Sequence, residues 1–442
     1  PQVIARWAEI DPLLVLATLA VALCLFVIVI KRATISPTVT LIWNALFVFA
    51  LTAAIALQQM NFPSDRSAYP IFGTAATVWS WLPLIVALLL SPIIFVDLGL
   101  FARQIIDAQP KPRTLGIGFS LAALWALILI FANVSTSVYD YLPVFGPLWR
   151  DREWLVFLLG GLGLVLPLLA VRKDSLRFGG IELPTEAFRA MLMTLILFGV
   201  MTLFGAWANT ARPIAPSAPA DTLKIMTYNI QQGYDASGQK NYDGQLALIR
   251  QIAPDVVGLE ESDTSRIANG NSDVVRYFAD HLGMYSYYGP KTVQGTFGVA
   301  LLSRYPIENP RTFYMFSEGE QTATIVAEIM VNGKTYHIMV THLGNDGPLP
   351  QVLDVLSQID RQSNTVLMGD FNLRPTTDQY RQITTVLDDA WVRAGSPQPI
   401  GAEWDANDRI DHAFISPSVN VSDAQYVLAP TSDHPALVAD VK

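Results

Sequence analysis

Polar residues of the types that bind phosphate and metal ions follow apolar stretches in the C-terminal half of this chain. The stretch Val366-Leu367-Met368-Gly369-Asp370-Phe371-Asn372 reads as a buried strand that stops at Gly369. Because side chains alternate along a strand, Asp370 and Asn372 point the same way and Phe371 points to the opposite face. A carboxylate beside an amide can hold a metal-bound water or a phosphoryl oxygen, although a strand end of this kind, taken alone, is more often an ordinary turn.

The same pattern recurs at other strand ends and strengthens the chemical interpretation. The polar residues that follow or end apolar runs are Asn229, Glu260, Glu261, His342, Asp411, Asp433 and His434. Several strand ends that deliver carboxylates, amides and imidazoles to one rim would form an oxygen-rich site flanked by histidines. Hard oxygen ligands favour Mg²⁺, Mn²⁺ or Ca²⁺ over zinc. A divalent cation among such groups is typical of phosphate-ester hydrolysis.

The elements that must position these residues form a strand-and-helix sequence from about residue 221 onward. Strands are predicted at Leu223–Asn229, Val256–Leu259, Thr296–Ser303, Thr322–Val331, Thr335–Thr341, Thr365–Met368, Asp411–Ser416 and Ala436–Val441. Helices are predicted at Asp243–Ile252, Val352–Gln362 and Tyr380–Leu387. Many strands with interspersed helices favour a mixed α/β sandwich over a strictly parallel fold.

Taken together, these motifs resemble the endonuclease/exonuclease/phosphatase superfamily, which includes deoxyribonuclease I-like nucleases, inositol polyphosphate phosphatases and sphingomyelinases. The resemblance covers residues 221–442 and implies a four-layer α/β sandwich of the deoxyribonuclease I-like type. It further implies a metal site that uses Asn229 and Glu261, with Asp433 beside the metal. By the same resemblance, the catalytic groups are His342, which contacts the phosphate, Asp370 and Asn372, which orient the nucleophile, and His434, which is oriented by Asp411.

Other polar residues near these motifs are expected to have structural roles. Glu260 stands where relatives more often have Gln, and we expect its extra carboxylate to point away from the site rather than to strengthen metal binding. His412 follows Asp411 on the same strand and should therefore face away from the cleft. His281 and His337 lie outside the motifs.

The N-terminal half has the composition of a membrane domain. The 442-residue chain is 51% hydrophobic and only 15% charged, and the apolar excess lies almost wholly before residue 210. About six segments are long enough to cross a bilayer: Pro12–Ile30, Val39–Leu57, Thr74–Phe101, Leu115–Val134, Trp154–Val171 and Ala187–Ala208. We therefore expect an all-α polytopic membrane domain at 1–210, a linker rich in Pro and Ala at 211–220, and a catalytic domain at 221–442.

The distribution of basic residues predicts the orientation of this integral membrane protein. Nine Lys and Arg residues follow the first, third and fifth apolar segments, against five on the opposite side. By the positive-inside rule, the catalytic domain is extracytoplasmic, at the plasma membrane of a bacterium or facing the lumen in a eukaryote. Two outer loops, 58–73 and 138–153, carry aromatic residues that either anchor helices at the interface or line a lipid route to the catalytic domain.

A narrower resemblance links the whole architecture to eukaryotic GPI-anchor lipid-remodelling proteins and their bacterial relatives. It rests on spanning helices with an outer catalytic domain and on the stretches Gly258–Asp263 and Thr341–Asn345. The favoured hypothesis is a metal-dependent phosphodiesterase that hydrolyses a lipid headgroup, with the bilayer and a membrane lipid as its partners.

The alternatives are an extracytoplasmic tethered nuclease and a non-catalytic headgroup-binding or remodelling module. Residues 221–442 carry 15 Lys and Arg against 27 Asp and Glu, a net charge of 15 − 27 = −12. Nucleic acid is thus an unlikely partner, since its binding usually requires a basic surface. The retained Asp370, Asn372 and His434 favour catalysis over simple binding. The single cysteine, Cys24, excludes a disulfide framework and a cysteine-based metal site. The sequence gives no indication of oligomeric state.

Overall fold

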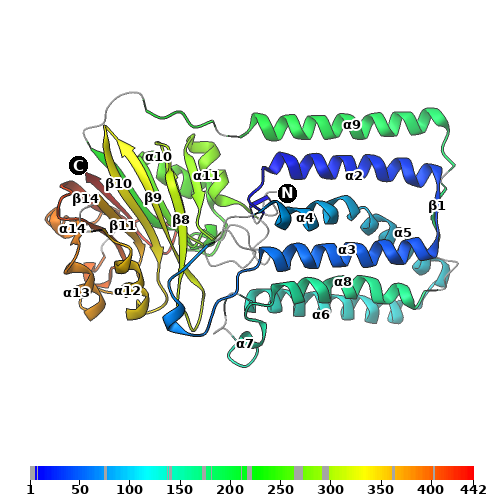
Figure 1. The fold of residues 1–442 in the computed structure, drawn as a ribbon, viewed down its shortest axis with the longest axis horizontal. Helices are drawn as coiled ribbons and strands as arrows, with labels where there is room; N and C mark the ends of the chain where they lie inside the picture. Colours follow the sequence, from blue (N-terminus) through cyan, green and yellow to red (C-terminus); the bar gives the residue numbers. More distant parts are fainter. Residues whose placement is uncertain are drawn as a thin grey trace.

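The computed structural model consists of a helical bundle and a two-sheet domain at one end of that bundle (Figure 1). It describes residues 1–442 except 1–4, 7, 74–76, 137, 139–141, 172–175, 181, 211, 217–221, 263–271, 291–297, 361–363 and 402–403. The predicted linker at 211–220 and the start of the strand predicted at Thr296 lie partly outside the described residues.

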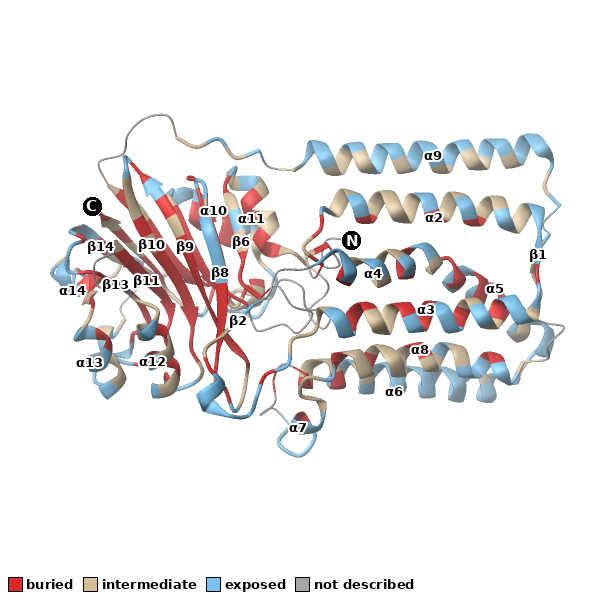
Figure 2. Cartoon of the chain, viewed as in Figure 1, coloured by how far each residue is buried: buried red, intermediate tan, exposed pale blue. Residues whose placement is uncertain are grey.

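The bundle contains long apolar helices, and the candidate spans among them range from 0% to 44% buried within the protein. They are α2 (Pro12–Arg32), α3 (Pro37–Gln58), α4 (Val78–Leu90), α5 (Ile93–Ala108), α6 (Pro112–Ser135), α8 (Glu153–Leu169) and α9 (Thr185–Ala208), with a short α7 (Gly146–Trp149). Figure 2 shows their largely exposed surfaces, which in a bilayer would contact lipid rather than water.

The prediction of about six spans agrees with these helices except at two places. Among the described residues, five segments are long and apolar enough to cross a membrane, with α4 and α5 together counted as one. Ser91 and Pro92 lie between α4 and α5, where proline interrupts the helical hydrogen bonding. The fifth predicted segment corresponds to α8, which has 17 residues and is shorter than the five candidate spans.

Two stacked mixed sheets form the second part of the protein, and a core of apolar residues lies between them. The first sheet has the order β12-β13-β11-β10-β9-β8-β2, and the second has the order β14-β15-β4-β5-β7-β6. The strands of the first are β2 (Ile71–Phe72), β8 (Glu308–Met315), β9 (Thr322–Val331), β10 (Lys334–His342), β11 (Asn364–Asp370), β12 (Asp388–Asp389) and β13 (Asp411–Ile415). Those of the second are β4 (Leu223–Asn229), β5 (Val256–Glu260), β6 (Tyr285–Tyr288), β7 (Ala300–Ser303), β14 (Val421–Val427) and β15 (Ala436–Val441).

Helices cover the outer face of each sheet and complete four layers. Residues of α10 (Tyr242–Ile252) and α11 (Val274–Leu282) pack on the second sheet around Phe278. Residues of α12 (Leu349–Ser357) and α13 (Asp378–Thr384) pack on the first sheet around Phe371 and Phe414. Short α14 (Ala390–Arg393) contributes Trp391 to the core between the sheets. The predicted four-layer α/β sandwich is therefore confirmed.

The remaining described elements are one small sheet and three short 3-10 turns. A two-stranded sheet pairs β1 (Thr34–Ile35) with β3 (Phe178–Gly179) at the end of the bundle far from the large sheets. The 3-10 turns are η1 (Arg66–Ala68), η3 (Gln231–Gly233) and η5 (Ala406–Asp408).

One strand of the first sheet comes from the helical part of the chain. The loop between α3 and α4 is expected from the sequence to lie on the outer side of the membrane. It supplies β2, which pairs antiparallel with β8. Its Phe62 is 3% exposed and belongs to the core between the sheets, with its ring 5.0 Å from that of Tyr314. The aromatic residues of this loop thus pack on the sheet domain.

Candidate active site

Strand pairing in the first sheet brings three of the predicted catalytic residues to the same edge. Parallel pairing of β10 with β11 places His342 opposite Asp370, and antiparallel pairing of β11 with β13 places Asp370 opposite Asp411. Gly369 allows this approach, because a Cβ atom there would lie 1.9 Å from the carbonyl oxygen of Thr341. A side chain at position 369 would force β10 and β11 apart.

The second sheet contributes the remaining groups across the cleft. Asn229 ends β4, Glu261 follows β5 in a left-handed backbone conformation, and His434 precedes β15. The Nδ2 atom of Asn229 donates to Asp370 Oδ2 at 3.0 Å and to Glu261 Oε1 at 3.3 Å. One amide therefore links carboxylates that belong to different sheets.

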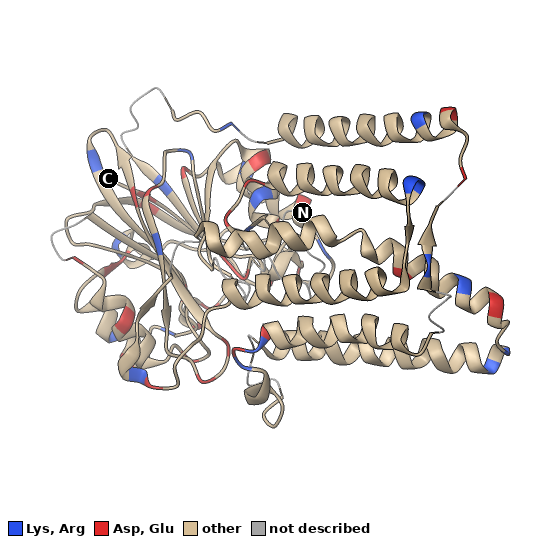
Figure 3. Ribbon diagram, turned by 45° about the vertical axis from the view of Figure 1, so that its right-hand side comes forward, with Lys and Arg blue, Asp and Glu red and all other residues tan. Residues whose placement is uncertain are grey.

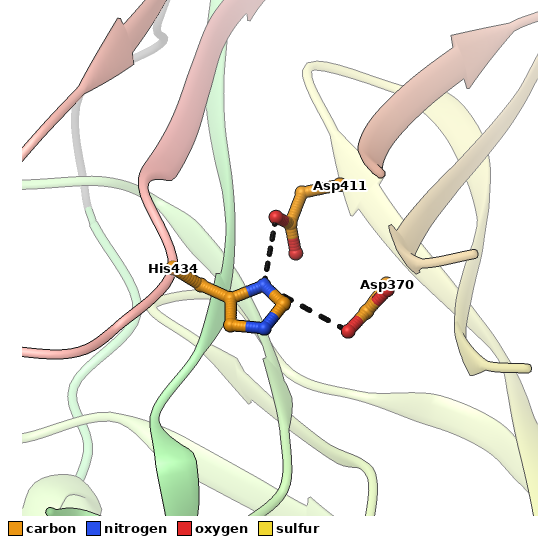
Figure 4. Close-up of side chains that lie close together, drawn as sticks. All are labelled: Asp370, Asp411 and His434. Atoms are coloured by element: carbon orange, nitrogen blue, oxygen red, sulfur yellow. Dashed lines mark hydrogen bonds and ion pairs between the residues drawn. The ribbon is translucent and has the colours of Figure 1, made fainter. Parts of the chain in front are cut away.

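His434 lies between two buried carboxylates, as Figure 4 shows. Its Nδ1 atom is 2.9 Å from Asp411 Oδ2 and 3.8 Å from Asp370 Oδ2. Burial lowers the pKa of His434, but the charges and hydrogen bond of Asp411 and the charge of Asp370 outweigh it and raise the pKa to about 10. Without a bound cation, the imidazole is therefore positively charged at neutral pH.

Asp370 is fixed in place by a set of directed contacts. The backbone N–H of Asn372 donates to Asp370 Oδ1 at 2.9 Å, and His342 Nε2 lies 3.8 Å from Asp370 Oδ2. The side chain of Asn372 donates to the carbonyl oxygen of Leu343 at 2.9 Å and lies 3.4 Å from His342 Nε2. Asn372 thus joins the ends of β10 and β11.

These groups line one cleft of about 450 Å³. Glu261, His342, Asp370, Asn372 and His434 all contribute to its surface. Asp411 lies behind His434 and is 1% exposed, which suits a residue that orients the imidazole. Burial raises the pKa of Asp411, while the charge of His434 opposes the shift. Asp433 is exposed and, like Asn229 and Asp411, is not among the described residues that line the cleft; its predicted place beside a metal stays a prediction.

The donor atoms of the site fit a hard divalent cation. Asp370, Asp411 and His434 offer ligand atoms that all lie within 4.8 Å of one another. Asp411 Oδ1 is buried and accepts no hydrogen bond, and Glu261 lies across the Asn229 amide from Asp370. Carboxylate oxygens of this density are typical of Mg²⁺ or Mn²⁺ sites. The cluster of Asp370, Asp411 and His434 consists of residues that the sequence assigned to catalysis rather than to the metal.

Two polar residues outside the cleft match the structural roles expected from the sequence. His412 is fully buried on the opposite face of β13, where its Nε2 atom lies 3.0 Å from the carbonyl oxygen of Leu373. Glu260 is also fully buried and does not line the cleft; the hydroxyl of Thr227 donates to its Oε1 atom at 2.8 Å. Burial raises the pKa of Glu260 well above its ordinary value, and the charge of Asp411 adds to this effect.

Sequence reasoning missed the wall of the cleft opposite these strand ends. Phe316, Ser317, Glu318, Gly319 and Glu320 form this wall, and Arg66 from the α3–α4 loop lies on it. Arg66 and Glu318 are 252 positions apart in the chain, and neither stands in a recognisable motif. The pairing of β2 with β8 and the packing of Phe62 and Tyr69 bring them together.

Comparison with known proteins shows which proteins this two-sheet domain and its cleft resemble. Residues 220–390 match the family model described as "PGAP2IP, C-terminal nuclease-like domain". This match confirms the resemblance to the endonuclease/exonuclease/phosphatase superfamily that the motifs indicated. Asp411 and His434 lie beyond the matched residues, so their assignment rests on their geometry.

Two curated relatives match parts of the chain. Protein cwh43 of Schizosaccharomyces pombe is 28% identical over 249 residues, which are 51% of this chain and 25% of the yeast protein. The uncharacterized protein YbhP of Escherichia coli K12 is 25% identical over 192 residues, which are 39% of this chain and 76% of that protein. The chain thus spans about a quarter of the length of cwh43.

Two solved structures match about half of this chain at low sequence identity. The human Nocturnin catalytic domain with bound sulfate is 21% identical, with a TM-score of 0.41, covering 52% of this chain and 95% of that one. An endonuclease/exonuclease/phosphatase from Beutenbergia cavernae is 22% identical, with a TM-score of 0.42, covering 50% and 71%.

Proposed function

We propose that this protein is a membrane-anchored, divalent-metal-dependent phosphodiesterase that hydrolyses a lipid headgroup on the extracytoplasmic side. The observation that carries this proposal is the cleft in which His434, Asp411 and Asp370 meet Asn229 and Glu261. The fold places this cleft on a domain whose sheet includes a strand from the helical bundle. Anchoring at a bilayer raises the effective concentration of a lipid substrate at the cleft.

Each side chain has a role that its contacts support. Asp370, held by Asn229 and by the backbone of Asn372, accepts the proton of the attacking water and orients it toward phosphorus. Protonated His434, oriented by Asp411, donates to a phosphoryl oxygen or to the leaving group. His342 and Asn372 donate to the phosphate from the first sheet. A cation held by the carboxylate of Glu261 would offset the negative charge on the phosphate.

The test is a hydrolysis panel on purified full-length protein with Mg²⁺, Mn²⁺ or Ca²⁺. Substrates are sphingomyelin, phosphatidylinositol and other glycerophospholipids in mixed micelles, beside single- and double-stranded DNA. We expect cleavage of a phospholipid that chelator abolishes, and a loss of about 100-fold or more in Asp370→Ala and in His434→Ala. Asp378→Ala, on the exposed start of α13, is the matched control and should retain activity.

Each other result favours a different function. DNA cleavage without lipid cleavage would favour the tethered nuclease. Binding of lipid without turnover in any metal would favour a headgroup-binding or remodelling module. Full activity in a folded Asp370→Ala protein would remove the catalytic assignment of this carboxylate.

A further inference from the structure

The loop between α3 and α4 is built into the sheet domain rather than resting on it. Ile71 and Phe72 pair with Tyr314 and Phe313 of the edge strand β8. The buried Phe62 and the ring of Tyr69, which meets the ring of Phe316 edge-on at 5.6 Å, fix the rest of the loop. In Figure 1 this blue segment leaves the bundle and runs beside β8. The position of the loop relative to the cleft is therefore set by packing and strand pairing.

This loop carries Arg66 to the wall of the active-site cleft. Arg66 begins η1, whose N-cap Asp65 accepts a hydrogen bond from the backbone N–H of Ser67. The guanidinium of Arg66 lies 4.9 Å from the ring centre of Phe316 and donates to Glu318 Oε1 at 3.2 Å. Arg66, Phe316 and Glu318 line the same cleft as Asp370 and His434.

The charge of the cleft makes this arginine distinctive. The described residues that line the cleft include the acids Glu261, Glu318, Glu320 and Asp370, and Arg66 is the one Lys or Arg among them. A phosphodiester carries a negative charge that this acidic lining repels. The planar guanidinium is suited to binding two phosphate oxygens at once.

Arg66 can exchange its present partner for a ligand at small cost. The side chains of Arg66 and Glu318 are 61% and 80% exposed. Exposed ion pairs of this kind contribute little to stability, because water screens the charges. The Phe316 ring keeps the guanidinium on the cleft wall when the pair with Glu318 opens.

We propose that Arg66 is an anion-binding residue of the active site, contributed by the helical domain, that receives a phosphate group in the cleft. The phosphate belongs either to a lipid headgroup or to free phosphate. Only the identity of the lipid substrate rests on the function proposed above. Without this loop, the described lining of the cleft would contain no Lys or Arg.

The experiment compares full-length wild type, Arg66→Lys, Arg66→Ala and the control Arg381→Ala. Arg381 is a matched control because it is 67% exposed and pairs with Asp378 at 3.0 Å on the surface of α13. Binding of inorganic phosphate in the presence of Mg²⁺ is followed by phosphorus NMR titration, and KM and kcat are measured on phospholipid micelles. We expect Arg66→Ala to weaken phosphate binding and raise KM about tenfold, with kcat nearly unchanged. Arg66→Lys should be intermediate and Arg381→Ala should equal wild type, with one melting temperature for all four proteins.

The two proposals can fail separately. Phosphate binding that is equal in wild type and Arg66→Ala, or a wild type that binds no phosphate, would overturn the role of Arg66. An equal loss in Arg381→Ala would also overturn it, because the effect would then be one of general surface charge. A further result is a wild type that hydrolyses no ester while Arg66→Ala still binds phosphate more weakly than the wild type. That result would overturn the proposed hydrolysis but support the anion-binding role of Arg66.

Discussion

At the scale of single residues, the pKa of His434 is set by opposing effects of burial and neighbouring charges. Its imidazole is buried, which lowers its pKa, yet the neighbouring Asp411 and Asp370 raise the pKa to about 10. The folded-state pKa therefore lies above the ordinary value of 6.5. Protonated His434 contributes stability that is fully present below pH 6.5 and is lost as the pH rises through 10.

This coupling predicts a specific pH dependence of the metal-free protein. The imidazole of His434 should titrate with a midpoint near pH 10 in carbon-13 NMR spectra of histidine-labelled protein, and Asp411→Asn should lower that midpoint. The melting temperature should fall between pH 7 and pH 10, with a weaker fall in His434→Gln. A midpoint near the ordinary histidine value would contradict the ion pair seen in Figure 4.

The sequence predicted the residues of this site better than their surroundings. His342 and Asp370 end β10 and β11, and Asp411 begins β13, so pairing within one sheet brings together three residues that the family resemblance had implied. The predicted place of Asp433 beside a metal stays a prediction, because Asp433 lies in the loop before β15, where no strand period applies. Arg66 could not have been found, because it approaches the cleft only through tertiary packing.

At the scale of elements, the α3–α4 loop adds a strand to the first sheet and an aromatic side chain to the core between the sheets. Phe62 belongs to the apolar core between the two sheets, and its ring contacts that of Tyr314 on β8. Truncating a buried Phe to Ala removes this apolar burial and leaves a cavity.

Phe62→Ala should therefore destabilise the sheet domain by about 3–4 kcal/mol. For a domain of this size, that loss lowers the melting temperature by roughly 6–12 °C. The measurement is thermal unfolding of full-length protein in detergent. Phe72→Ala is the control from the same loop, because Phe72 is 40% exposed and should cost much less. Equal melting temperatures for Phe62→Ala and wild type would mean that the loop does not pack as described.

Long strands with a clear apolar pattern were predictable, and short or interrupted ones were not. β9 has the predicted bounds Thr322–Val331, and β4 has the predicted bounds Leu223–Asn229. β8 contains Pro310 and a register shift between Glu308 and Arg311, which hide its strand pattern. β2 has two residues, and its conformation depends on the edge of β8 rather than on its own sequence.

At the scale of the whole molecule, charge separates the two ends of the bundle. Lys and Arg residues gather at the end far from the sheets, as Figure 3 shows. Lys31 and Arg32 lie in the last turn of α2 there. At the other end, Arg6 and Arg66 pair with Asp273 and Glu318 of the sheet domain, at 2.9 Å and 3.2 Å. Lys and Arg residues therefore gather at the end of the bundle opposite the sheet domain.

The positive-inside rule then predicts that the far end of the bundle is cytoplasmic and the cleft is extracytoplasmic. The single native cysteine is removed as Cys24→Ala, and one new cysteine is introduced as Lys111→Cys at the far end or Asp378→Cys on the exposed surface of α13. A membrane-impermeant maleimide on intact cells should label Asp378→Cys at once. It should label Lys111→Cys only after the membrane is permeabilised, because that residue would face the cytoplasm.

The opposite labelling pattern would place the cleft in the cytoplasm and change which lipids it meets. The substrate would then lie in the cytoplasmic leaflet, and an extracytoplasmic nuclease would be excluded at the same time. Labelling of both positions in intact cells would indicate that the cells are leaky. The Cys24→Ala protein without an introduced cysteine cannot detect such leakage, because it has no thiol to label. A second variant with the same predicted side, Arg103→Cys in the C-terminal part of α5, must behave as Lys111→Cys does if the predicted orientation is correct.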